Sequence, residues 1–199
     1  EGLLASAEGL LDYEWPHINA GKILEFFRTG NRRPFLDVWS EKRNNLWTLV
    51  QAELIQGDGR YLEQIINGIW NLCEESSWVV PGHMNQFYGD SILPHAGEHY
   101  VDLMAGRNAA LLAWTVYFLG DELDEVSPVI RDRIYYEVDK RVLTPALEMD
   151  HWWMAFGEGR INNWNTYGNT NWLSAVLILE PDPERRVQSI YRILESLDK

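Results

Sequence analysis

Cysteine is almost absent from this chain of 199 residues, and so are several features that define common classes of protein. The single cysteine, Cys73, excludes an internal disulfide framework and a zinc site built from cysteines. No apolar run approaches the roughly 20 residues that cross a bilayer, so we expect no membrane partner. The P-loop, the G-x-G-x-x-G pattern and the G-x-S-x-G nucleophile elbow are also missing. We therefore expect no cofactor and no resident metal.

Basic residues are scarce as well. The chain has 17 Lys and Arg against 30 Asp and Glu, which gives a net charge of -13. This balance argues against a nucleic-acid partner, because such a partner needs a broad positive surface. Hydrophobic residues make up 46% of the sequence and charged residues 24%, as in an ordinary globular domain of a size that can bury a large core.

The apolar residues that are present follow a helical period. Leu62, Ile65, Ile69 and Cys73 form one stripe at helical spacing, and no segment shows the sustained two-residue alternation of a strand. We therefore predict a single all-α domain over residues 1–199. The expected helices cover residues 2–11, 19–29, 36–56, 60–76, 99–120, 127–147, 168–180 and 183–198.

Short and long connections alternate along the chain. The turns at 57–59, 121–126 and 181–182 are short, whereas the loops at 77–98 and 148–167 exceed the usual length of a helix–helix connection. Short turns join antiparallel hairpins, and the hairpins begin near residues 36, 99 and 168 as a loose repeat. In such an up-and-down series, the segments 30–35, 77–98 and 148–167 are expected to lie at one end of the domain.

This end of the domain collects residues suited to binding an acidic sugar. Indole and phenol rings stack on sugar faces, arginine can bind a carboxylate through two hydrogen bonds, and histidine transfers protons near neutral pH. We predict His83 and Asn163 as catalytic residues. The predicted substrate-binding residues are Arg32, Trp78, Trp152, Arg160, Asn162, Trp164 and Tyr167.

Asparagine is concentrated between Arg160 and Trp172, where five asparagines fall within ten positions. Asparagine commonly caps helices, so we expect Asn169 or Asn171 to cap the helix that follows. Capping accounts for one or two of the five. Asn162 and Asn163 are therefore predicted to donate hydrogen bonds to a ligand.

Two further chemistries fit parts of the sequence. His95 and His99 belong to an H-x-x-E-H pattern, which in zinc peptidases needs a third metal ligand that the sequence does not show clearly. A pair of carboxylates would suit a glycoside hydrolase. The acidic residues expected near the same end are Asp90, Glu98, Asp102, Asp150 and Glu158.

Several short segments, in this order and spacing, resemble the N-terminal helical domain of heparinase II/III-like proteins. They are Phe27–Arg32, Trp70–Glu75, Trp78, Pro81–His83, Asp102–Trp114, Trp152–Trp153, Asn162–Asn165 and Asn171–Leu173. The resemblance implies an incomplete (α/α) toroid of antiparallel helical hairpins and a longer multidomain chain with a β-sandwich region after the toroid. It also implies cleavage of uronic-acid polysaccharides by β-elimination, in a periplasmic or extracellular setting.

The resemblance also assigns roles to residues. Asn163 aligns with the asparagine that lies against the substrate carboxylate in several such lyases, and the next position, often histidine there, is Trp164 here. The tyrosine and second histidine of the family would lie after Lys199. We therefore predict an acidic-polysaccharide lyase in the full-length form, with an acidic polysaccharide or oligosaccharide as partner. The alternatives are a glycoside hydrolase on the same scaffold and a non-catalytic glycan-binding protein.

Overall fold

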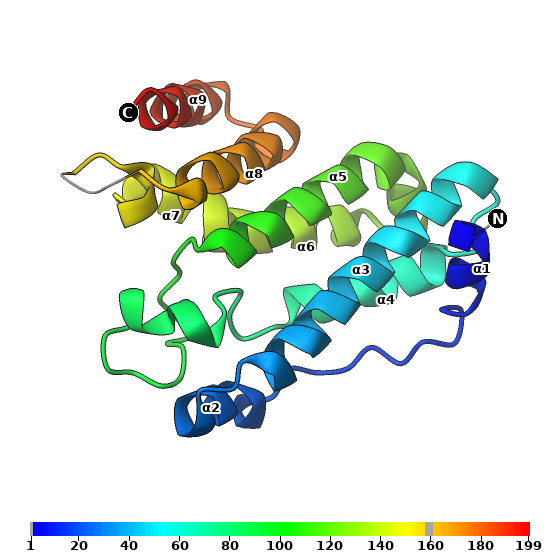
Figure 1. Ribbon diagram of the computed structural model, residues 1–199. Coiled ribbons are helices and arrows are strands. Elements are labelled where there is room, and N and C mark those ends of the chain that lie inside the picture. Colours follow the sequence, from blue (N-terminus) through cyan, green and yellow to red (C-terminus); the bar gives the residue numbers. More distant parts are fainter. Residues whose placement is uncertain (1, 158–160) are drawn as a thin grey trace.

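The computed structural model describes residues 2–157 and 161–199, and within these ranges the chain is helical and contains no strand (Figure 1). The α-helices are α1 (Gly2–Glu8), α2 (Ala20–Thr29), α3 (Arg33–Gln56), α4 (Leu62–Cys73), α5 (Leu103–Val126), α6 (Pro128–Val138), α7 (Thr144–Glu148), α8 (Asn163–Leu179) and α9 (Pro183–Leu197). Two short 3₁₀ segments, η1 (Pro81–Gln86) and η3 (Trp152–Met154), lie in the long loops. The all-α prediction is confirmed.

Three helical hairpins make up most of the structure: α3 with α4, α5 with α6, and α8 with α9 (Figure 1). The first helices of the hairpins pack side by side in one layer, in the order α3, α5, α8. The second layer contains α4, α6, α7 and α9. Within the described residues this is an open array of hairpins, and closure into a toroid remains a prediction.

The three helices of the first layer run parallel, so that their N-termini lie at one end of the domain. The long loops lie at this same end, as Figure 1 shows, and the loop at 77–98 contacts α2 through η1. Helix N-termini carry unpaired backbone N–H groups and partial positive charge, so they attract anions. The fold therefore places the polar loops at the positive end of three helices.

Several helices differ from the predictions, among them α5 at its end and the expected helix 127–147 in its internal geometry. The expected turn at 121–126 belongs to α5, which continues to Val126 and bends at Leu119, where φ is -127° and ψ is 18°. The expected helix 127–147 contains a π-helical turn, η2 (Asp139–Leu143), immediately before Pro145. Proline lacks the N–H for a helical hydrogen bond and clashes with the preceding turn, and a π turn is a common local adjustment.

The asparagine-rich segment caps its helix earlier than expected. α8 begins at Asn163, and the side chain of Asn162 accepts a hydrogen bond of 2.8 Å from the backbone N–H of Trp164. The predicted caps, Asn169 and Asn171, lie inside the helix instead, so that prediction was wrong. Asn169 is buried and donates to Ser196 of α9, which explains its presence within a helix.

The core fills the space between the two layers. Leu46, Ile65 and Trp172 are completely buried there. Cys73 is also buried, and burial raises the pKa of its thiol to about 12, so it behaves as a small apolar residue. Among the described residues no helix has the length and apolar character needed to cross a bilayer.

Candidate functional site

His83 is held in a fixed orientation by a buried carboxylate. Its Nδ1 atom lies 2.7 Å from Oδ2 of Asp102, whose side chain is fully buried at the start of α5. Asp102 also accepts hydrogen bonds from the backbone N–H groups of Val80, Met104 and Ala105, so it acts as an acceptor throughout. The proton of the imidazole is therefore assigned to Nδ1, which leaves Nε2 as the nitrogen that can accept a proton.

Two tryptophans form a wall beside this imidazole. The ring of Trp164, at the start of α8, lies 4.5 Å from the ring of His83, and Trp152 lies 4.8 Å from Trp164 between ring centroids. Trp152 is 43% exposed, and its Nε1 donates to Oε1 of Gln86 in the loop that carries His83. The structure thus brings together the loops at 77–98 and 148–162, as the pattern of connections predicts.

Arg32 and His83 line one small pocket, together with Leu36 of α3 and Met104 of α5. The pocket has a volume of about 40 Å³, which holds a water molecule or a carboxylate group but not a sugar ring. A sugar would therefore lie outside the pocket, with only a polar substituent reaching between Arg32 and His83.

The remaining predicted site residues lie near the first turn of α8. Asn163 is exposed at the first position of the helix, next to Trp164. Asn162 is also exposed, but its side-chain Oδ1 already accepts the capping hydrogen bond from the backbone N–H of Trp164. Tyr167, one turn further along, is 39% exposed. Arg160, predicted to bind substrate, lies outside the described residues.

Trp78 is not a groove residue, contrary to the prediction. It is 2% exposed, its Nε1 donates to the backbone oxygen of Leu72, and the guanidinium of Arg141 lies over its ring. An indole has one polar atom, and once that atom has an internal partner the rest of the ring gains most from burial in the core. Sequence position within a long loop did not distinguish this core role from a ligand-binding one.

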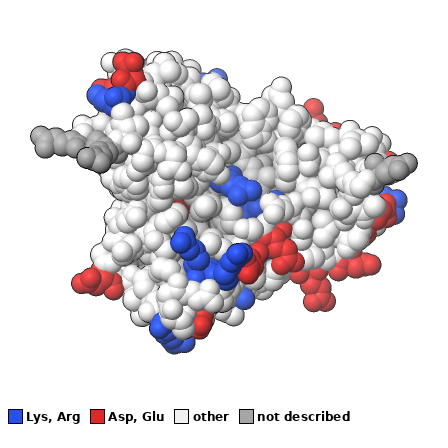
Figure 2. Space-filling view, viewed as in Figure 1, with Lys and Arg blue, Asp and Glu red and all other residues white. Residues whose placement is uncertain are grey.

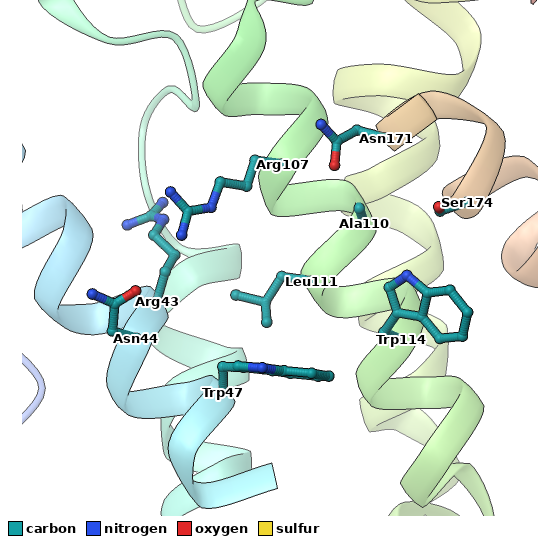
Figure 3. A pocket seen from close by; sticks show the side chains of 9 residues that line it. All are labelled: Arg43, Asn44, Trp47, Arg107, Ala110, Leu111, Trp114, Asn171 and Ser174. Atoms are coloured by element: carbon teal, nitrogen blue, oxygen red, sulfur yellow. The ribbon is translucent and has the colours of Figure 1, made fainter. Parts of the chain in front are cut away.

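A larger pocket lies further along α3 and α5, where its first lining residue on α3, Arg43, is about two helical turns past Leu36 (Figure 3). It has a volume of about 250 Å³, close to the lower end of small-molecule pockets, roughly 300 Å³. Figure 3 shows that α3, α5 and α8 all contribute to it. We call it the arginine pocket, and its lining residues are Arg43, Asn44, Trp47, Arg107, Ala110, Leu111, Trp114, Asn171 and Ser174.

Arg43 of the arginine pocket belongs to a buried charge cluster. Glu75 accepts hydrogen bonds from Arg43, at 2.5 and 2.9 Å, and from Lys42, at 2.6 Å. Burial alone would raise the pKa of Glu75, but Arg43 and Lys42 together lower it. Burial lowers the pKa of Lys42, which Glu75 partly offsets. Two cations thus share one carboxylate, and the formal charge of the cluster is positive.

Basic side chains gather on this face of the molecule despite the acidic composition. Figure 2 shows Lys and Arg atoms in and below a central hollow, while most Asp and Glu atoms lie towards its margins. The small pocket at His83 and the arginine pocket are both lined by residues of α3 and α5, and the candidate site includes both. At a rise of 1.5 Å per residue, the ten residues from Met104 to Trp114 span about 15 Å of α5.

Few features of the sequence point to the arginine pocket. Arg43, Arg107 and Asn171 lie inside helices, where a single polar residue usually faces solvent, and only their common face in the structure joins them. One signal was available. Leu36, Arg43 and Trp47 are spaced so that they share a face of α3. The charged Arg43 on this face does not fit a stripe of core residues.

The alternative chemistries find little support in the geometry. No group of three or more His, Cys, Asp or Glu suited to a metal is present among the described residues, and His95 of the H-x-x-E-H pattern is exposed. For glycoside hydrolysis, Asp102 is fully buried and occupied by hydrogen bonds, and Asp150 is paired with Arg192. Glu158 lies outside the described residues.

Comparison with known proteins adds no family assignment. No family model matches this chain, and a search of the curated proteins finds no match either.

Proposed function

We propose that this chain forms the sugar-binding helical part of a lyase that cleaves acidic, uronic-acid-containing polysaccharides by β-elimination in the full-length protein. The observation that carries the proposal is the oriented imidazole of His83, 2.7 Å from buried Asp102 and beside the partly buried ring of Trp164, which in turn contacts the exposed ring of Trp152. The resemblance to heparinase II/III-like proteins, with their toroid and β-sandwich, agrees with this arrangement.

β-Elimination requires a base for a weakly acidic proton. The C5–H bond of the uronate breaks, a double bond forms between C4 and C5, and the C4–O bond breaks as the leaving oxygen takes up a proton. In the proposal, Nε2 of His83 accepts the C5 proton, and Asp102 positions the ring and stabilises its charged form. The amide of Asn163 and the guanidinium of Arg32 neutralise the substrate carboxylate, which makes the C5 proton more acidic.

The test follows the unsaturated product by its ultraviolet absorbance. With uronate polymers and the full-length protein, we expect His83→Gln to lower the rate by at least about 100-fold, because general base catalysis commonly contributes that much. His95→Gln, which changes an exposed histidine, is the control and should keep full activity. The proposal would be wrong if the wild-type protein formed no unsaturated product from any uronate polymer.

A second function, glycan binding without turnover, is favoured by one observation. Trp164 stands where the resemblance leads one to expect histidine, and its ring covers one side of His83 at 4.5 Å. Saturable binding of uronate oligosaccharides without any product would support this alternative. Reducing ends without unsaturation would instead indicate hydrolysis.

A further inference from the structure

The arginine pocket contains a cation that the fold does not neutralise. Arg107 is partly buried on α5, and no acidic side chain pairs with it among the residues that the structure describes. Its guanidinium lies 5.4 Å from the ring centroid of Trp39, and that of Arg43 lies 4.4 Å from the same ring. Two guanidinium groups therefore lie close to one indole.

Glu75 cannot balance this charge. It already binds Arg43 and Lys42 in the buried cluster, so Arg107 adds a further positive charge beside Arg43 without a carboxylate of its own. Like charges close together in a partly desolvated pocket repel one another, and an anion between them relieves the repulsion. The arrangement favours a bound anion over an empty pocket.

The residues that line the pocket indicate which kind of anionic molecule would bind there. Trp47 and Trp114 flank it from α3 and α5, with Trp114 38% exposed, and Asn171 offers an amide from α8 (Figure 3). Flat aromatic faces beside a guanidinium and an amide suit a ring with an apolar face, hydroxyl groups and an oxyanion. A sugar that carries a carboxylate or a sulfate has all three.

We propose that the arginine pocket is a second, anionic sugar subsite, in which Arg107 binds a carboxylate or sulfate of the glycan, about one helical turn along α5 from Met104 of the His83 pocket. This inference rests on the proposed function for the kind of ligand, but it concerns binding and not turnover. Arg43 is 1% exposed and donates its hydrogen bonds to Glu75, Asn108 and the backbone of Trp39. It therefore contributes positive electrostatic potential to the pocket but no direct contact with the ligand. Arg107 makes the contact.

The test measures binding by calorimetry with three probes: a uronate trisaccharide, its carboxyl-reduced neutral form, and a sulfated form of that neutral sugar. One of the two charged probes is expected to bind the wild-type protein. We expect Arg107→Gln to weaken the affinity for that probe by about tenfold or more and to leave the affinity for the neutral probe unchanged. The charged probe that loses affinity identifies the oxyanion. Arg60→Gln, which removes an exposed arginine near α1, is the matched control and should bind like wild type.

A second variant guards against loss of folding. Arg107→Lys keeps the positive charge but loses the planar guanidinium with its paired N–H donors. We expect this variant to bind the charged probe a few-fold more weakly and to have an unchanged melting temperature. Equal weakening of charged and neutral probes, or unchanged binding of both charged probes by Arg107→Gln, would overturn the subsite. Failure of the elimination chemistry alone would show as missing unsaturated product with this binding pattern intact.

Discussion

Two histidines, one buried and one partly buried, show how single residues make the stability of this chain depend on pH. His99 and His151 both have pKa values lowered to about 4, chiefly because burial removes the hydration of the charged ring. His151 is 5% exposed, stacks on Trp153, and packs edge-on against Phe87. Its Nε2 atom is buried without a hydrogen-bond partner. The fold therefore accommodates this ring only in its neutral form.

The stability of the chain should fall as the pH drops from about 6.5 towards 4. In this range the unfolded chain binds a proton on His151 and the native chain does not, so His151 should remove about 2 kcal/mol between pH 7.5 and pH 5. We expect His151→Phe, which keeps the stacked ring, to flatten this dependence by that amount. Chemical denaturation at the two pH values measures it, and an unchanged difference between wild type and variant would contradict the assignment.

At the scale of secondary-structure elements, one glycine sets how closely α8 approaches the loop at 148–162. A Cβ atom at Gly168 would lie 2.9 Å from the ring of Trp153, which is 3% exposed. Trp153 cannot move easily, because its Nε1 donates to the backbone oxygen of Val101 at 2.7 Å. Gly168 therefore allows the helix, the loop and the start of α5 to meet.

Gly168→Ala should destabilise the chain by about 1–3 kcal/mol, because overpacking against a fixed ring costs more than the gain in helix propensity. Gly106→Ala in α5 is the control. A Cβ atom there would lie 3.5 Å from Cβ of Asn171, an ordinary contact, so the substitution should be neutral or slightly stabilising. Thermal or urea unfolding measures both, and equal effects at the two glycines would show that Trp153 does not resist the added methyl group.

The asparagines of α8 show why element boundaries were harder to predict than element types. Asn165 and Asn169 are buried and donate to Ser196, whose hydroxyl in turn donates to the backbone oxygen of Met154. This network ties α8, α9 and the preceding loop together. Helical period predicts that a helix exists, but a buried polar pair depends on a residue some 30 positions away, which local patterns do not reveal.

At the scale of the whole molecule, the cluster around Glu75 joins the first two hairpins. Lys42 and Arg43 come from α3, Glu75 follows α4, and Arg43 also donates to Asn108 of α5 at 2.7 Å. The cluster is buried and every contact in it is charge-assisted. Removal of the single carboxylate would leave two cations in the interior without a counter-charge.

Glu75→Gln should therefore lower the free energy of unfolding by about 3–5 kcal/mol, the range found when one partner of a buried ion pair is removed. Glu74→Gln removes the same charge from the exposed neighbouring position and is expected to change it by less than about 0.5 kcal/mol. Denaturant unfolding of both variants checks this. Similar small effects in both would mean that water reaches the cluster.

The sequence predicted the all-α class, the alternation of connections, and the meeting of Arg32, His83 and Trp164 at one end. These follow from helical period and loop length, which are local properties. Trp78 and the arginine pocket could not be predicted in this way, because the role of each side chain depends on which face of a neighbouring helix it meets.

Asp102 has two structural roles, because it caps α5 and also orients the imidazole of His83. One of its carboxylate oxygens serves the first turn of α5, and the other serves His83 and Val80. The start of α5 and the orientation of the imidazole thus depend on one carboxylate. A substitution of Asp102 is therefore expected to disturb the helix start and the position of His83 together.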